Sequence, residues 1–382
     1  KRREMVKRSV AAITDIYQNS ILKDSSRNSF MIKRMEDLAD RTIWAMGEQL
    51  KCGDFVPFVF EHKFNMEVGD GDRKQLMSGT IDRVDICENG TDVYVRIIDY
   101  KTGKKDFNIV KTYYGIDIQL MVYMEAAMKL VAKMRPGKNV IPAGVFYYNI
   151  SDPIVSATTE SAEEIEDKIK GELRRKGMVN SDKDIAEKMD NTEGTSLNIP
   201  VSRKADGGFD SRRSKVMNTE QFNILGRFVD VRAIDTADRI VGGDIRRSPY
   251  KDGQFSSCDR CPYGAVCGFS VDLPGCNYRK LKKFDDEVLW NNIKEGVDEN
   301  GKKIDDIDST PDNNVPEEDD QDIEKIKVKY FDLALKKWVT ESIVTYNGKT
   351  TVTKTGHTGD ENPEPPAKVE IRQDRINKTT VK

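Results

Sequence analysis

Two predicted strands, 77–86 and 93–101, constrain the fold of this chain more than any other feature because a tight turn joins them. Successive side chains of a β-strand lie on opposite faces. The segments are joined across residues 88–91, Glu-Asn-Gly-Thr. Asn-Gly is typical of a type I′ hairpin turn, because both central residues of that turn need positive φ. The sequence therefore predicts an antiparallel hairpin with a type I′ turn.

The segments before this hairpin predict a helical region followed by a first strand. Residues 1–54 show helical periodicity among charged residues and are expected to form a helical lead-in. Residues 56–60 then alternate as in a strand. We expect this strand to begin a domain that extends over residues 55–285.

The segments after the hairpin predict alternating helices and strands. A helix is expected at 117–134, followed at 143–150 by a strand so apolar that both of its faces must be buried. Residues 161–215 are expected to form a charged insertion at the surface, and residues 218–240 another helix. The order strand, hairpin, helix, strand predicts an α/β domain with a mixed sheet flanked by helices.

Three polar side chains are predicted to meet at one edge of the hairpin. Asp99 and Lys101 lie two residues apart, so they project from the same face of their strand, and Asp82 can be brought beside them from the preceding strand. Carboxylates are hard oxygen ligands for Mg²⁺, a metal that suits phosphodiester hydrolysis. We expect Asp82, Asp99 and the backbone carbonyl of Tyr100 to bind Mg²⁺. Lys101 is expected to orient the attacking water or to stabilise the developing negative charge.

Other polar residues near the hairpin are candidates for the same site. Gln119 and Tyr123 are four residues apart on the predicted helix and therefore share a face. Gln119 is expected to reach the metal-bound water or a phosphate, whereas Tyr123 either contacts DNA or packs in the core. Glu61 is either a further acid of the site or an exposed strand residue. Asp85 lies three residues from Asp82 and is expected to face away.

Composition excludes some classes of protein. The chain is 33% charged, and none of its apolar runs approaches the about 20 residues of a membrane span. Its first residues are basic and lack the apolar stretch of a signal peptide, so we expect a cytoplasmic protein without membrane association. The net charge of -3 argues neither for nor against nucleic acid. The sequence G-x-x-x-x-G-K-[ST] does not occur, so this chain is not itself an ATP-driven motor.

Four of the six cysteines lie between residues 258 and 276. Such clustering in a large chain indicates a metal site in a reducing compartment rather than a disulfide scaffold. Cys258, Cys261 and Cys267 have the spacing C-x2-C-x5-C, which presents three thiolates on a short loop to Zn²⁺ or to an iron-sulfur cluster. Spacing alone does not distinguish these two metals.

Several of these segments resemble the motifs of a known family. GTIDRVD at 79–85, IIDYKTG at 97–103, QLMVY at 119–123 and GVFYYNI at 144–150 resemble, in this order, the RecB-type nuclease module of the PD-(D/E)XK class. With GDFVPFVFEHKF at 53–64 and CDRCPYGAVCGF at 258–269, they are similar to the C-terminal nuclease domain of the B subunit of AddAB (RexAB) helicase-nucleases. The resemblance covers about residues 1–283.

This resemblance implies a restriction-endonuclease-like fold and a Mg²⁺-dependent deoxyribonuclease, expected to be an exonuclease. It places Asp82, Asp99, Lys101 and Gln119 in the active-site motif positions. It further implies the 5′-ended strand of DNA as substrate, a role in recombination and double-strand-break repair, and a partner A subunit of the AddA type that hydrolyses ATP.

The resemblance also implies that the cysteine segment binds a [4Fe-4S] cluster. In this family three cysteines follow the nuclease core and a fourth precedes it. Cys52 lies too close to the first strand to match that upstream position, and Cys276 is an equally poor substitute. We therefore expect the fourth ligand to lie outside the printed sequence.

Two alternatives to an active nuclease use the same residues. A catalytically inactive nuclease fold would serve as a scaffold for DNA ends or another subunit, although the intact Asp82, Asp99 and Lys101 argue against it. A zinc-bound interaction module is the other alternative. Residues 286–325 are rich in Asp and Glu and are expected to be a disordered linker, followed at 326–382 by a small β-rich tail without an assigned role.

Overall fold

The structure is a computed structural model and divides into two compact units, which are described separately. One unit comprises residues 1–259 and 280–309, and the other comprises residues 260–279 and 310–382. The residues that the structure describes are 1–16, 25–68, 74–156, 161–296, 323–332, 337–346, 349–356 and 370–376.

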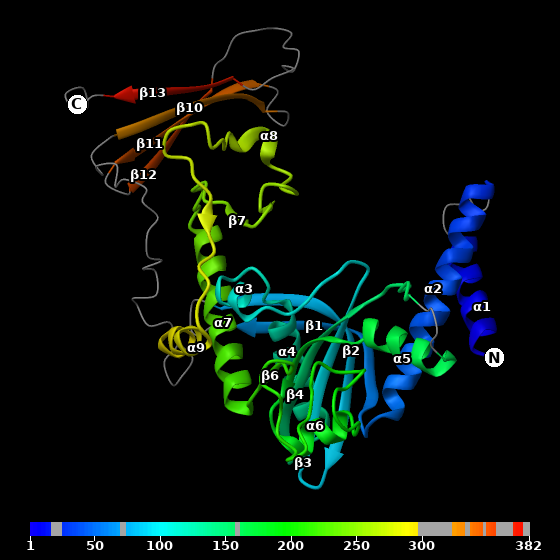
Figure 1. Ribbon diagram of the computed structural model, residues 1–382. Coiled ribbons are helices and arrows are strands. Elements are labelled where there is room, and N and C mark those ends of the chain that lie inside the picture. The colour runs from blue at the N-terminus through cyan, green and yellow to red at the C-terminus, as the bar shows by residue number, and fades with distance from the viewer. Residues whose placement is uncertain are drawn as a thin grey trace. The chain divides into compact units, whose positions relative to one another are not determined.

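A six-stranded mixed sheet forms the centre of the larger unit (Figure 1). The order of the strands in space is their order along the chain: β1 (Val56–Val68), β2 (Gln75–Asn89), β3 (Asp92–Lys101), β4 (Asn139–Asn149), β5 (Lys176–Asn180) and β6 (Val216–Met217). β1, β2 and β3 are antiparallel, β3 and β4 are parallel, β4 and β5 are antiparallel, and β5 and β6 are parallel. The predicted mixed sheet is confirmed.

The parallel pair β3 and β4 requires a crossover, because a tight turn can join only antiparallel strands. The crossover contains α3 (Ile109–Tyr113) and α4 (Gln119–Met134). α4 buries Leu120, Met124 and Val131 among its apolar residues, so the packing of its apolar side holds it against the sheet. This helix begins two residues later than the sequence predicts.

Helices cover both faces of the sheet. α4, α7 (Thr219–Val241) and α9 (Asp286–Glu295) pack on one face, where their apolar side chains form a core with Tyr147. α6 (Lys183–Met189) packs on the other face, in a core that contains Phe146. Tyr147 and Phe146 are neighbours on β4, and they belong to different cores because successive strand residues point in opposite directions. The prediction that β4 is buried on both faces is confirmed.

Three further helices belong to this unit: α1 (Arg2–Ile16), α2 (Ser26–Lys51) and α5 (Ala162–Glu172). α1 and α2 pack against each other within the helical lead-in that the sequence predicts. The hydroxyl of Ser25 accepts a hydrogen bond from the backbone of Asn28 and so caps the start of α2. Among the described residues, no helix combines the length and the apolar character needed to cross a membrane.

The turn between β2 and β3 differs from the prediction. Asn89 pairs with Asp92, so the two central residues of the turn are Gly90 and Thr91. Of these, only Gly90 has a positive φ, 59°. A positive φ at the first central residue alone is the pattern of a type II′ turn, so the predicted type I′ turn is wrong, although the hairpin itself is present.

Residues 161–215 also differ from the surface insertion that the sequence analysis expects. β5 lies inside the central sheet between β4 and β6. Gly177 permits this close pairing, since a Cβ at that position would lie 1.9 Å from the carbonyl oxygen of Val145. Charged residues on both sides of this short strand make it difficult to predict from the sequence. Its pairing with β4 nevertheless makes it part of the core.

Part of the expected acidic linker is also structured. Residues 286–295 form α9, and Leu289 and Ile293 of this helix are buried in the core. The remaining linker residues from 297 to 322 lie outside the described residues. In the smaller unit, an antiparallel sheet has the order β12 (Lys349–Gly356), β11 (Lys337–Tyr346), β10 (Ile323–Asp332) and β13 (Glu370–Ile376), as expected for a β-rich tail.

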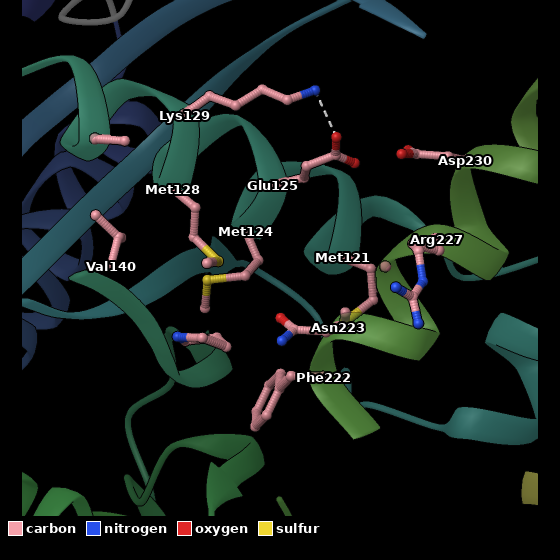
Figure 2. Close-up of a pocket in the computed structure, with 13 residues that line it drawn as sticks. Met121, Met124, Glu125, Met128, Lys129, Val140, Phe222, Asn223, Arg227 and Asp230 are labelled. Atoms are coloured by element: carbon pink, nitrogen blue, oxygen red, sulfur yellow. Dashed lines mark ion pairs between the residues drawn. The ribbon is translucent and has the colours of Figure 1, made fainter. Parts of the chain in front are cut away.

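A pocket of about 460 Å³ opens between α4 and α7, on the side of α4 that packs against α7 (Figure 2). Methionine side chains of α4 line its interior, and the carboxyl groups of Glu125 and Asp230 approach each other at one end (Figure 2). Glu125 is paired with Lys129, whereas the Asp230 Oδ1 atom is buried without a hydrogen-bond partner. Burial, with the nearby Glu125 carboxyl, raises the pKa of Asp230 to about 8.

We predict that Asp230→Asn stabilises this unit at pH 8. The pKa of Asp230 is raised in the folded state, so folding loses stability as the pH rises from the ordinary Asp range towards about 8. The free energy of unfolding of the variant should exceed that of wild type by about 1 to 3 kcal/mol at pH 8 and by much less at pH 5. Urea unfolding at both pH values measures this gain. Asp238→Asn on the same helix is the control, and equal gains for both variants would contradict the prediction.

Candidate active site

The register of the central hairpin brings the two predicted metal-binding aspartates together. Arg83 pairs with Ile98 at the end of the β2–β3 ladder, so Asp82 and Asp99 are the residues that directly follow the last pair on the two strands. The Asp82 Oδ2 atom accepts a hydrogen bond of 2.7 Å from the backbone N–H of Tyr100, which orients this carboxylate towards β3. Both carboxylates therefore lie at the same end of the hairpin.

Lys101 and Gln119 join Asp99 in a closed polar network. The Lys101 Nζ atom lies 2.6 Å from Asp99 Oδ2 and donates to Gln119 Oε1 at 3.1 Å. The Gln119 Nε2 atom donates to Asp99 Oδ1 at 3.0 Å. Gln119 is the first residue of α4, so the start of the crossover helix orients both charged groups.

Tyr123 packs against the core, one of the two roles that the sequence left open, and it also contacts Gln119. Its hydroxyl accepts a hydrogen bond of 2.9 Å from Gln119 Nε2, and its ring packs edge-on against Phe64, with 5.7 Å between the ring centroids. The close approach of these rings requires Gly79, because a Cβ there would lie 2.9 Å from the Phe64 ring and 3.3 Å from the Tyr123 ring. The glycine of the G-T-I-D segment thus makes room for the network on α4.

The site suits a divalent cation. Asp99 is only 2% exposed, and its burial raises the pKa of this carboxyl, an effect that Lys101 opposes and Asp82 reinforces. Asp99 Oδ2 is buried, and the Lys101 ammonium lies 2.6 Å from it. Two neighbouring carboxylates, one of them buried, fit a hard metal ion such as Mg²⁺, which often takes only one or two carboxylates from the protein. The carbonyl of Tyr100 remains a predicted ligand.

Asp85 lies on the opposite face of the sheet, as the sequence analysis expects. It is fully buried and contacts the guanidinium groups of Arg83 at 2.6 Å and Arg96 at 2.9 Å. Burial alone would raise the pKa of Asp85, but Arg96 and Arg83 lower it below the ordinary value. The Tyr100 hydroxyl also faces this side, 3.5 Å from Arg83. This buried ion group lies directly behind the candidate active site.

The backbone conformation of Glu61 was not predicted from the sequence. The pairs Phe60–Arg83 and His62–Ile81 bracket it and place it opposite Asp82. Its φ is 47°, and it is the one non-glycine residue with positive φ in the described part of the chain. Left-handed backbone at such a residue costs free energy and is concentrated at functional sites. The Glu61 side chain is exposed.

Two buried residues that were not predicted from the sequence lie on the same face of the sheet. Tyr147 pairs with Asp99 across β3 and β4, and its hydroxyl donates a hydrogen bond of 2.9 Å to Asp117. Asp117 is 5% exposed and lies just before α4. The alternation of strand 143–150 was a usable signal for Tyr147, whereas the position of Asp117 depends on how the crossover folds back.

The predicted cluster ligands fall in both units. Cys258, in the larger unit, lies in a turn that Asp259 closes by accepting hydrogen bonds from the backbone and hydroxyl of Ser256. In the smaller unit, Cys261 precedes α8 (Gly264–Cys267), which Cys267 ends. All three are free thiols, the donor type that iron-sulfur clusters and zinc take. Among the described residues, no three Cys, His, Asp or Glu side chains already form a metal cage, and the cluster stays a prediction.

Cys52 does not take part in a cysteine group. Its thiol lies at the end of α2 and donates to the backbone carbonyl of Glu48 at 3.3 Å. This local hydrogen bond explains why the residue is half-buried at a helix end.

A mixed sheet flanked by helices, with two aspartates and a lysine near one end of the β2–β3 hairpin and a glutamine from the crossover helix, is consistent with the fold of a nuclease. The chain belongs to the PD-(D/E)XK nuclease superfamily, whose family model matches residues 2–268.

Curated relatives of the chain are named as the B subunit of an ATP-dependent helicase/deoxyribonuclease. The relative from Thermoanaerobacter sp. (strain X514) is 34% identical over 296 residues, which cover 75% of this chain and 25% of the relative. The relative from Caldanaerobacter subterraneus subsp. tengcongensis is 35% identical over 316 residues, 80% of this chain and 27% of the relative. The relative from Clostridium botulinum (strain Hall) is 36% identical over 289 residues, which cover 73% of this chain and 25% of the relative. The chain spans about a quarter of the length of these relatives.

We predict that Asp85→Ala strongly destabilises the larger unit. The substitution leaves Arg83 and Arg96 buried without their carboxylate, and breaking a buried ion group in this way costs about 3 to 5 kcal/mol. Chemical unfolding measures the loss. Asp92→Ala, at the accessible start of β3, is the control and should cost less than about 1 kcal/mol. A similarly small loss for Asp85→Ala would contradict the prediction.

Proposed function

We propose that this chain is a Mg²⁺-dependent deoxyribonuclease domain that hydrolyses phosphodiester bonds of a DNA strand. The observation that carries the proposal is the convergence of Asp82, Asp99, Lys101 and Gln119 at one end of the β2–β3 hairpin. The family supports nuclease chemistry, and the name of the relatives supports DNA as the substrate.

In this proposal Asp82 and Asp99 hold the metal, and the other residues position the reactants. Mg²⁺, when bound, supplies a more acidic water and offsets negative charge on the phosphate. Gln119 holds Asp99 through its amide nitrogen and Lys101 through its amide oxygen, so both charged groups keep one orientation. The Lys101 ammonium, which is 29% exposed, orients the attacking water or stabilises charge that develops on the phosphate oxygens.

The cysteine segment has a structural role in this proposal. Cys258, Cys261 and Cys267 would supply thiolates to a [4Fe-4S] cluster, with zinc as the alternative. Metal binding by such a segment contributes folding free energy, so its loss would destabilise the protein without removing a group that contacts substrate.

The finer assignments follow the family resemblance. We propose exonuclease action on the 5′-ended strand, in the cytoplasm, within a recombination and double-strand-break-repair complex. An AddA-type partner subunit would supply ATP hydrolysis. The relatives are named as one subunit of an ATP-dependent helicase/deoxyribonuclease, which supports such a partner.

We predict that Asp99→Ala abolishes Mg²⁺-dependent cleavage of end-labelled single-stranded DNA. The substitution removes a metal ligand and one partner of Lys101 and Gln119, so the rate should fall roughly 10³-fold or more. Asp92→Ala on the same strand is the control and should keep the wild-type rate.

The main alternative is a catalytically inactive scaffold that binds DNA ends or another subunit. Lack of cleavage by a folded wild-type chain, with DNA binding retained, would favour that scaffold. The alternative does not account for a network in which each polar group of Gln119 has a charged or hydroxyl partner.

We further propose that Glu61 is a third acid of this site, because its strained backbone holds it opposite Asp82. Glu61→Gly should relieve the left-handed strain and change stability by between zero and about 1 kcal/mol in the favourable direction. Cleavage should nevertheless fall at least about tenfold, since a carboxylate is lost.

Glu67→Gly is the matched control for this variant. Glu67 lies on the same strand in ordinary extended backbone, so its glycine variant should lose about 1 kcal/mol and keep full activity. Thermal unfolding and cleavage assays on both variants measure these effects. Unchanged cleavage by Glu61→Gly would remove Glu61 from the site.

A further inference from the structure

A second lysine is fixed beside the candidate active site and has no part in the chemistry above. Lys105 lies in the loop that follows β3, and Asn149 at the end of β4 holds its backbone on both sides. The Lys105 backbone N–H donates to Asn149 Oδ1 at 3.0 Å, and Asn149 Nδ2 donates to the Lys105 carbonyl at 2.9 Å. Asn149 pairs with Lys101 in the sheet, so this clamp brings the loop back to the edge that carries Lys101.

The side chain of Lys105 is held as firmly as its backbone. Its Nζ atom lies 3.2 Å from Asp117 Oδ1 and 5.6 Å from the centroid of the Tyr147 ring. The Tyr147 hydroxyl donates to the same Asp117 oxygen. Asp117 and Tyr147 are both buried, whereas 41% of the Lys105 side chain is exposed. The buried Asp117 and Tyr147 thus support a Lys105 side chain that stays partly exposed to solvent.

Lys105 and Lys101 share one aromatic ring. The Nζ atom of Lys101 also lies 5.6 Å from the Tyr147 ring centroid, so the two ammonium groups are separated by no more than twice that distance. Phosphates along one DNA strand advance by about 3.4 Å of helix axis per nucleotide. This upper limit allows the two lysines to contact phosphates of the same strand.

We propose that Lys105 binds the phosphate next to the one that is hydrolysed, and that Asn149, Asp117 and Tyr147 position it for this contact. The inference rests on the proposed nuclease function and adds to it the path of the strand, from Lys101 towards the loop after β3. The competing explanation is purely structural, since Lys105 also neutralises the buried Asp117. An experiment must therefore separate phosphate binding from stability.

The test compares how salt weakens DNA binding to the full chain and to two lysine variants. A fluorescent single-stranded oligonucleotide with hydroxyl groups at both ends is titrated in EDTA, and log affinity is plotted against log salt concentration. Removal of one phosphate contact should reduce the slope by about 0.7 and weaken binding about fivefold at 0.1 M salt. We expect this for Lys105→Met but not for Lys104→Met, its exposed neighbour. Equal slopes for wild type and Lys105→Met would overturn the proposal.

Two further variants exclude a purely structural effect. Lys105→Arg keeps the positive charge and should restore the slope. Lys105→Met combined with Asp117→Asn removes both charges of the ion pair together, so it should fold even where the single variant is unstable, and it should show the same reduced slope. A lower melting temperature with a wild-type slope in the double variant would show that Lys105 acts only on stability.

The remaining measurements separate this inference from the proposed function. The salt dependence of kcat/KM with Mg²⁺ should show the same difference between Lys105→Met and Lys104→Met. If wild type neither binds nor cleaves DNA, the nuclease proposal fails and this inference with it. If wild type cleaves DNA and only the slope prediction fails, the assignment of Lys105 to phosphate binding is wrong and the nuclease proposal is unaffected. A loss confined to oligonucleotides with a 5′-phosphate would overturn the assignment to an internal phosphate in favour of a terminal one.

Discussion

The antiparallel pairing of β2 with β3 is the constraint on which the rest of the site depends. Its register brings Asp82 and Asp99 together just beyond the last pair, Arg83–Ile98, and places Asp85 between Arg83 and Arg96 on the opposite face. A slip of one residue would exchange the two faces, because side chains alternate with a period of two. The two aspartates would then leave the face that α4 covers, and the arginines would lose their partner. The buried ion group therefore favours one register, the one that builds the active site.

The crossover helix α4 links the core to the candidate site, because its packing fixes the positions of its polar residues at the site. Its first turns carry Gln119 and Tyr123, while its apolar side packs on the sheet and on α7. Gly79 on β2 allows Phe64 and Tyr123 to approach closely, so a change in strand packing would move the hydroxyl that Gln119 contacts. The orientation of Lys101 thus depends on apolar contacts several residues away from any charged group.

The site balances negative and positive charge along one edge of the sheet. Two carboxylates lie near the end of the β2–β3 ladder, and burial raises the pKa of Asp99, an effect that the Lys101 ammonium opposes. Two lysines flank the Tyr147 ring on the same side. The proposed metal ion would be held by the acids and the proposed DNA phosphates by the lysines, so the two proposals require charges of opposite sign along this edge.

The sequence by itself determined the hairpin, the candidate residues Asp82, Asp99, Lys101 and Gln119, and the strand that is buried on both faces, because alternation and four-residue spacing are local properties. Only the tertiary structure decided that β5 enters the sheet, that α9 packs on the core, that Glu61 takes a left-handed backbone opposite Asp82, and that Asn149 clamps Lys105. Each of these features depends on contacts between residues far apart in the chain. Their sequence signals are weak for that reason. The positions of the short strand β5, the acidic helix α9 and Lys105 depend on the surfaces against which they pack.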